Sequence, residues 1–458
     1  MRIDQFGYDL TVSSPIAAEA WDKMVLAFLA HAAKTPEYLG AVLTEEPDFA
    51  MAHATKGLFF LMLGRRELNE AAQEGYRTAQ AAALRSAPTA REMGYVRALG
   101  AWLDGRPSET VQEMEAILLH WPEDALAMKI SHATRFILGD GKGMRASIEA
   151  LLPAYDAKNP ARGYMFGCHA FSLEETGDYA RAETAGRLGL SLSPDDAWGL
   201  HAVAHVFDMT ANARAGLNWL EGRENAWAHC NNFRYHVWWH KALMHLDQGE
   251  IDAVLDLYDT EVRHDHTDDF RDISNGTSLL MRLELEGIDV GGRWEELADI
   301  SERRTDDACL LFADLHYLLA LMGGNREVAT KRMMARLQRD AKQTNTGELM
   351  ARMANPGLSA ATGLEAFGEG DYKTAFLNLG RARRSMQLAG GSHAQRDIFE
   401  RLTIDSAIRS GFIDEAENIL HERTVQRAGR LDSYASARLE LIASSRVDWD
   451  EAGRLPAE

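Results

Sequence analysis

The sequence predicts an all-α protein that folds as a right-handed solenoid of paired helices. Apolar residues recur with the helical period along nearly the whole chain, whereas alternating β-branched runs and Asn-Gly hairpin signals are nearly absent. Short helix breakers recur at an even pitch, and only 11 of the 458 residues are proline. Because 46% of the residues are hydrophobic, one continuous core is expected, and residues 1–458 should form a single solenoid.

The turns of the predicted helix pairs are marked by residues at equal steps. Successive positions are 36 residues apart, which is close to the period of about 34 residues of helix–turn–helix repeats. The series is Gly105, Gly141, Gly177, Ala213 and Gly249. Residues before each turn should form the first helix of a pair, and stacking of the pairs should place these first helices along a concave inner surface.

The same turn signature recurs outside this series. Gly-Asp-Tyr, with alanine three residues after the tyrosine, begins at both Gly177 and Gly370. Gly64, Gly324 and Gly411 mark further turns toward the two ends. Two long polar interruptions, residues 263–274 and 342–356, are expected to be long loops between repeats.

The charge balance excludes several classes of partner. The formal net charge is -20, from 49 basic and 69 acidic residues, and such a surface repels nucleic acid and anionic lipid. No window of about 18 uncharged apolar residues and no signal-peptide pattern occurs, so no membrane association is expected. The three cysteines are widely spaced and form no C-x-x-C pair, which predicts reduced thiols and a cytoplasmic protein.

Several stretches resemble the tetratricopeptide repeat protein 38 family. They include Asn231 to Leu243 (NNFRYHVWWHKAL), Leu310 to His316 (LLFADLH) and Ala389 to Asp397 (AGGSHAQRD), and the resemblance spans most of the chain. It implies a tetratricopeptide-like solenoid. It brings no activity and no catalytic residue, because a fold alone does not define a function.

Six histidines share one predicted helical face. They lie 8, 9, 12 or 13 residues before the turn of their repeat, and these offsets fall on one side of a helix. The six are His132, His169, His201, His205, His236 and His240. This side should face neighbouring first helices or the concave groove.

We call these six histidines the histidine stripe, and the residues at its centre are the predicted catalytic residues. Imidazoles beside carboxylates can move protons near neutral pH. We therefore expect His201, His205, His236 and His240 to be catalytic, together with Asp208 one turn after His205. The alternative is that these histidines are packed residues whose ring nitrogens find ordinary hydrogen-bond partners.

The predicted ligand-binding residues flank the same stripe. Aromatic rings beside histidines form a wall that suits a small polar ligand, and an arginine after a glycine pair suits an anionic group. These residues are His169, Trp198, Trp239, His132 and Arg396, of which Arg396 follows Gly390 and Gly391.

Metal binding is weighed separately. The pairs His201/His205 and His236/His240 have the i,i+4 spacing that can present two imidazoles to one zinc ion. Neither pair contains the glutamate of an H-E-x-x-H motif, and Asp208 is only a plausible third ligand. The sequence prediction therefore assigns no metal and no cofactor.

Two functions follow from these observations. The first is a concave pocket lined by histidine and tryptophan that binds a small polar molecule, as in a non-redox hydrolase or lyase. The second is a scaffold that binds a peptide or protein in the groove without catalysis. Phosphate-binding loops, G-x-S-x-G elbows and C-x-x-C motifs are absent from the sequence, and a homo-oligomer is compatible with it.

Overall fold

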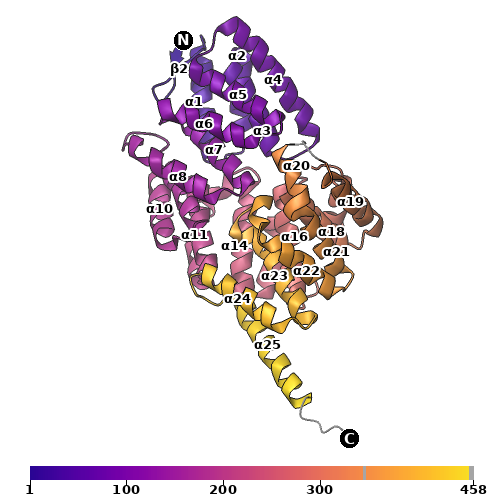
Figure 1. The fold of residues 1–458 in the computed structure, drawn as a ribbon. Coiled ribbons are helices and arrows are strands. Elements are labelled where there is room, and N and C mark those ends of the chain that lie inside the picture. The colour runs from indigo at the N-terminus through magenta and orange to yellow at the C-terminus, as the bar shows by residue number, and fades with distance from the viewer. Residues whose placement is uncertain (344–346, 453–458) are drawn as a thin grey trace.

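A computed structural model describes residues 1–343 and 347–452 and confirms the all-α helical solenoid (Figure 1). The only strands in this part of the chain, β1 (Arg2–Ile3) and β2 (Asp9–Leu10), pair in a short antiparallel hairpin. None of the described helices combines the length and hydrophobicity that crossing a membrane requires.

Helices of the N-terminal part follow one another in pairs joined by short turns. The pairs are α1 (Pro15–Leu29) with α2 (Thr35–Glu45), α3 (Ala50–Met62) with α4 (Glu67–Ser86), α5 (Ala90–Leu103) with α6 (Pro107–His120), α7 (Ala125–Leu138) with α8 (Gly141–Leu151), and α9 (Arg162–Glu174) with α10 (Tyr179–Leu192). A short turn, η1 (Leu152–Ala154), follows α8.

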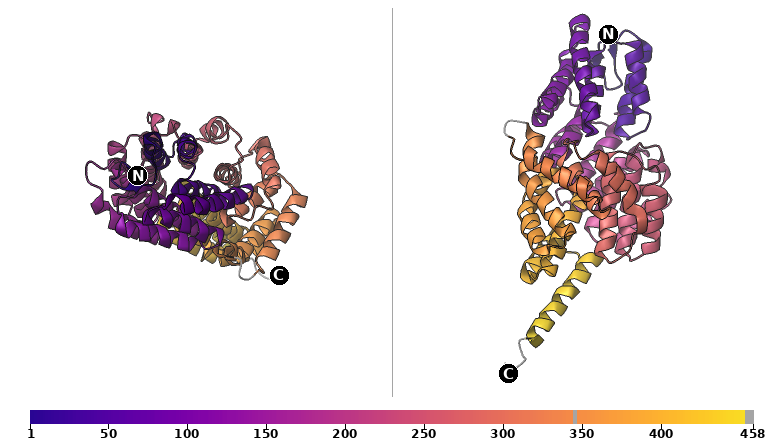
Figure 2. Two further views of the ribbon diagram at one scale, coloured as in Figure 1. Left: turned by 90° about the horizontal axis from the view of Figure 1, so that it is seen from above. Right: turned by 90° about the vertical axis from the view of Figure 1, so that its right-hand side faces the viewer.

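The pairing continues to the C-terminal part. The pairs are α11 (Ala197–Met209) with α12 (Ala213–Leu220), α14 (Phe233–Asp247) with α15 (Ile251–Leu257), α16 (Phe270–Leu285) with α17 (Trp294–Arg303), α18 (Leu311–Gly323) with α19 (Glu327–Asp340), α21 (Leu358–Gly368) with α22 (Tyr372–Arg383), and α23 (His393–Arg409) with α24 (Ile413–Gln426). Shorter elements are α13 (Asn225–Ala228), η2 (Tyr258–Val262), η3 (Gly291–Arg293), α20 (Glu348–Arg352), η4 (Met353–Gly357) and η5 (Met386–Ala389). The last helix, α25 (Ser433–Ala452), projects from the body of the molecule (Figures 1 and 2).

Three of the five predicted turn residues occupy the position that requires a glycine. Gly105, Gly177 and Gly249 connect the helices of their pairs with φ of 79°, 81° and 71°. This left-handed conformation carries no steric penalty for glycine. The turn prediction is confirmed at these residues.

The prediction is wrong by two residues at Gly141 and Ala213. The left-handed residues there are Gly139, with φ of 72°, and Ala211, with φ of 49°. Gly141 and Ala213 are instead the first residues of α8 and α12. At the first of these turns, Asp140 fixes the start of the helix, because its side chain accepts a hydrogen bond of 2.8 Å from Gly143 N.

Both predicted long loops are shorter in the structure. Within 263–274, coil runs only to Asp269, whose side chain accepts a 2.9 Å hydrogen bond from Arg271 N and so starts α16 at Phe270. Within 342–356, α20 and η4 are helical, and the buried Met353 anchors η4 in the core. Residues 344–346 of this second prediction lie outside the described residues.

The first helices pack against one another in the order α9, α11, α14, α16 and α18. Segments far apart in the sequence also contact each other. After α1, the carbonyl oxygen of His31 accepts a 2.8 Å hydrogen bond from Asn231 N. Glu348 N donates a 2.8 Å bond to Gly105 O, which holds α20 against α6. The inner faces of the central helices therefore become core.

Candidate functional site

Four histidines from two neighbouring first helices meet at the centre of the molecule. His201 and His205 lie one turn apart on α11, and His236 and His240 lie one turn apart on α14. Nitrogen atoms of the four, one from each ring, all lie within 4.8 Å of one another. We call this group the histidine cluster; it contains four of the six histidines predicted to share one helical face.

The histidine cluster is shut off from solvent. The residues have exposed fractions of 1% for His201, 0% for His205, 9% for His236 and 0% for His240. Ring centroids are 4.3 Å apart between His205 and His240 and 4.4 Å apart between His201 and His205. Such close imidazoles must share protons, bind a common cation or leave polar atoms unpaired.

The carboxylates beside the cluster come from α9 and its C-terminal end. Glu174 is fully buried, and its Oε2 lies 3.5 Å from Nδ1 of His205. Glu174, Glu175 and His205 form a second group whose oxygen and nitrogen atoms lie within 4.8 Å of one another. Glu174 therefore occupies the place that the sequence prediction gave to Asp208.

Asp208 is turned toward another partner. Its Oδ1 accepts a 2.9 Å hydrogen bond from Arg427 on the loop after α24, and the residue lines a cavity of about 300 Å³ with Arg282. The sequence prediction placed Asp208 on the same helix as His205, as the structure does. The arginine, 219 residues later, determines where the carboxylate points.

Burial sets the protonation of the cluster. Desolvation, reinforced by the neighbouring histidines, lowers the pKa of His201 and His240 well below the ordinary value, and the pKa of His236 to about 3. For His205, desolvation is outweighed by the negative charge of Glu174, so its pKa is raised. At neutral pH, three of the four rings are uncharged.

Most nitrogens of the cluster lack a hydrogen-bond partner. Within the described part of the chain, none is found for Nδ1 of His201 or for either nitrogen of His205 and His240. Both carboxylate oxygens of Glu174 are also without a hydrogen bond. His236 differs, because its Nδ1 lies 3.1 Å from Oδ1 of Asn275 and its Nε2 lies 3.0 Å from Nε2 of His201.

An aromatic wall surrounds the cluster. Trp198 has its ring centroid 5.1 Å from that of His201, and Trp239 stacks on His236 at 5.2 Å. Sequence reasoning missed Phe233, 5.1 Å from His201, and His31, which stacks on Phe233 at 4.6 Å. His31 follows α1, outside the repeat phase, so no periodic signal could have found it.

The two remaining histidines of the stripe lie apart from the cluster. The ring of His132 is 6.0 Å from those of Phe171 and Trp198, which separate it from the four. His169 Nε2 points instead to Glu149, at 3.3 Å. The structure therefore does not bring these two predicted ligand-binding residues together with the other four histidines.

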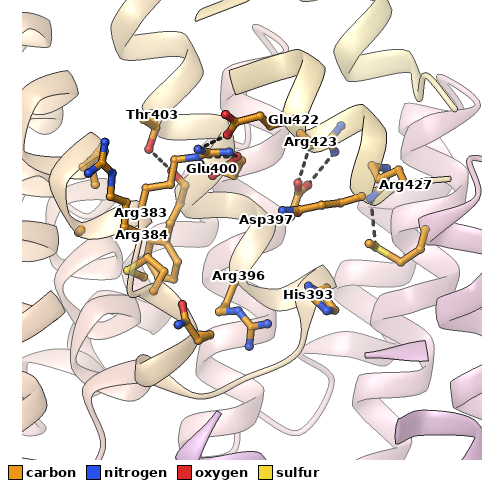
Figure 3. Close-up of a pocket in the computed structure, with 17 residues that line it drawn as sticks. Arg383, Arg384, His393, Arg396, Asp397, Glu400, Thr403, Glu422, Arg423 and Arg427 are labelled. Carbon is orange, nitrogen blue, oxygen red and sulfur yellow. Dashed lines mark hydrogen bonds and ion pairs between the residues drawn. The ribbon is translucent and has the colours of Figure 1, made fainter. Parts of the chain in front are cut away.

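A cavity of about 350 Å³ lies beside α22, α23 and α24 (Figure 3). Its wall contains five arginines and one histidine, and we call it the arginine cavity: Arg383, Arg384, Arg396, Arg423, Arg427 and His393. Three carboxylates, Asp397, Glu400 and Glu422, also line it. Glu175 Oε1 accepts a 2.8 Å hydrogen bond from His393 N, and Glu175 Oε2 lies 3.5 Å from Arg396 Nη2. Glu175 thus contacts the cavity wall and His205 at once.

The arrangement defines a helical-repeat protein with a buried histidine centre beside an arginine-lined cavity. Comparison with the models of known protein families finds no match.

Proposed function

We propose that the chain binds a small molecule carrying an acidic group in the arginine cavity. The observation that carries this proposal is the concentration of arginines around a 350 Å³ space in a chain whose net charge is -20. Ligand cavities for small molecules begin at roughly 300 Å³, and guanidinium groups suit carboxylate and phosphate.

Arg384 and Arg396 are the two arginines best placed to bind the ligand. Arg383 and Arg423 are held by carboxylates, at 2.7 Å from Glu400 and 2.6 Å from Asp397 (Figure 3). Arg384 has no hydrogen bond or ion pair to any described residue and is exposed. Arg396, predicted from the sequence to bind a ligand, has a longer ion pair than Arg383 and Arg423. Its Nη2 lies 3.5 Å from Glu175 Oε2, and its Nη1 donates to the backbone carbonyl of Gly391.

A ligand in this cavity would lie beside the histidine cluster, with Glu175 between them. We therefore propose a non-redox hydrolase or lyase reaction, as the sequence suggested. The observation in favour is the His205–Glu174 pair, in which a carboxylate raises the pKa of an imidazole inside an apolar wall.

A peptide-binding scaffold is the alternative, and it has less support. An extended peptide needs an open groove, whereas the inner helices here are buried against each other.

We also propose that the chain belongs to the tetratricopeptide repeat protein 38 family and that it is cytoplasmic. Paired helices support the first, and the unpaired Cys168, Cys230 and Cys309 support the second.

Calorimetric titration of the full chain with inorganic phosphate and with succinate tests the proposal. Arg396→Gln and Arg384→Gln should each weaken binding by about tenfold or more, because a charge-assisted hydrogen bond contributes about 1.5–3 kcal/mol. Arg381→Gln is the matched control, since Arg381 is exposed on α22 outside the cavity. Equal effects of the three substitutions, or no binding of either anion by the unaltered chain, would contradict the proposal.

A further inference from the structure

The histidine cluster has more nitrogen lone pairs than the protein uses. Five nitrogens of His201, His205 and His240 are buried without a hydrogen-bond partner among the described residues. Buried polar groups in native proteins are almost always paired, so each exception calls for a physical explanation. Other unpartnered buried atoms are scattered through the described core, but five histidine nitrogens and both carboxylate oxygens of Glu174 lie together at this point.

The distances fit one shared ion. One nitrogen from each of the four rings lies within a 4.8 Å span. Imidazole nitrogens bind zinc at about 2.0–2.1 Å, so ligand atoms around such an ion are separated by roughly 3–4 Å. The observed span is slightly wider than that spacing, and the four rings lie on two adjacent helices.

Hydrogen bonds outside the cluster orient one ring for this purpose. Oδ1 of Asn275 can only accept, so Nδ1 of His236 carries the proton and donates across 3.1 Å. The lone pair of Nε2 then points to the centre, 3.0 Å from Nε2 of His201. Such support of a ligand's second nitrogen is typical of histidines that bind metals.

We infer that His201, His205, His236 and His240 bind one divalent transition-metal ion, with the carboxylate of Glu174 beside His205 but outside the ligand set. This site goes beyond the proposed anion binding and does not rest on it. A cation would pair the lone pairs of the rings and the buried charge of Glu174, whose oxygens have no hydrogen bond.

The ligand set selects the class of metal. Imidazole nitrogens suit zinc, iron, nickel and copper, whereas magnesium and calcium prefer oxygen ligands. The competing interpretation is that four neutral histidines simply pack together. Stoichiometry and the identity of the ligands decide between these interpretations.

The test uses the untagged full chain after removal of metals with a chelator, with Co²⁺ as the probe. We expect one Co²⁺ per chain and a visible absorption band that Zn²⁺ displaces. The double substitution His201→Gln/His240→Gln should weaken binding by more than about 100-fold. Asn275→Leu, which removes only the support of His236, should weaken it by about 10–100-fold.

Matched controls separate this site from other histidines and from the arginine cavity. His132→Gln alters a buried histidine with two unpartnered nitrogens outside the four, and should leave Co²⁺ affinity unchanged. Arg396→Gln should also leave it unchanged, so the failure of anion binding and the failure of metal binding are distinguishable.

Two results would overturn the inference. One is the absence of stoichiometric Co²⁺ binding to the unaltered chain, which needs no variant to fold. The other is binding that is lost on replacing the exposed His264 and His266 but retained in Asn275→Leu and in the double variant.

Discussion

His205 lies between two chemical environments. On one side Nδ1 is 3.5 Å from the carboxylate of Glu174, and on the other its ring is 4.3 Å from that of His240. Neither nitrogen has a hydrogen bond in the described part of the chain. Since an unsatisfied buried polar group costs about 1–3 kcal/mol, the arrangement lowers stability unless a bound ion or ligand offsets the cost.

Replacing His240 by leucine should therefore stabilise the metal-free chain. The change removes two unpartnered nitrogens and fills similar space beside Trp239, so we expect the free energy of unfolding to rise by about 1–3 kcal/mol. Urea unfolding in the presence of a chelator measures this change. His316→Leu is the control, because Nδ1 of His316 lies 2.8 Å from Phe312 O and its loss should offset any gain. A large loss of stability in His240→Leu would indicate a packing role.

At the scale of elements, α9, α11 and α14 build the site, and each contributes through one helical face. The sequence predicted correctly that these four histidines share one face, because neighbouring first helices keep a constant orientation along the solenoid. Asp208, the predicted acid, does not make the closest carboxylate contact to His205. Glu174 reaches His205 from the adjacent helix, whereas Asp208 turns to Arg427, and no local pattern encodes that partner.

The C-terminal helices depend on a network of buried ion pairs. Arg423 on α24 lies 2.6 Å from Asp397 on α23 and 2.6 Å from Asp432 before α25. Burial acts to raise the pKa of Asp397, but Arg423 and Arg401 hold it well below its usual range. The pKa of Asp432 is lowered in the same way, with Arg423 and Arg427 outweighing burial. Both carboxylates therefore stay charged in the folded protein at moderate acidity.

This network predicts acid-sensitive C-terminal helices. Because the folded pKa values lie below the unfolded value of about 4, the stabilisation is present above pH 4 and is lost as the pH falls through the folded values. Circular dichroism between about pH 6 and pH 2 should show a partial loss of helix before the main acid transition. Asp432→Asn should weaken this pH dependence. An identical acid transition in the variant would exclude the network as its cause.

At the scale of the whole molecule, the solenoid is closed by contacts between distant repeats. His31 accepts a hydrogen bond from Asn231, and Glu348 donates one to Gly105. Periodicity predicted the helix pairs and their stacking, since both depend on neighbours in sequence. It could not predict this closure, which stacks His31 on Phe233 beside the site.

Because distant repeats contact each other, local stability should be highest in the central helices and lowest at the C-terminal end. Helices α9, α11, α14 and α16 pack on both sides and across the interior, whereas α25 projects from the body (Figure 2). Hydrogen exchange should therefore be slowest in these four helices and fastest in α25. Central helices that exchange faster than the terminal ones would contradict this picture.

The most direct test of the central claim, that the histidine cluster is a metal centre, is anomalous scattering from crystals of the full chain grown with zinc. A difference map at the zinc absorption edge should show one strong peak within bonding distance of His201, His205, His236 and His240, close to Glu174. The absence of a peak there, or peaks confined to surface residues, would contradict the claim.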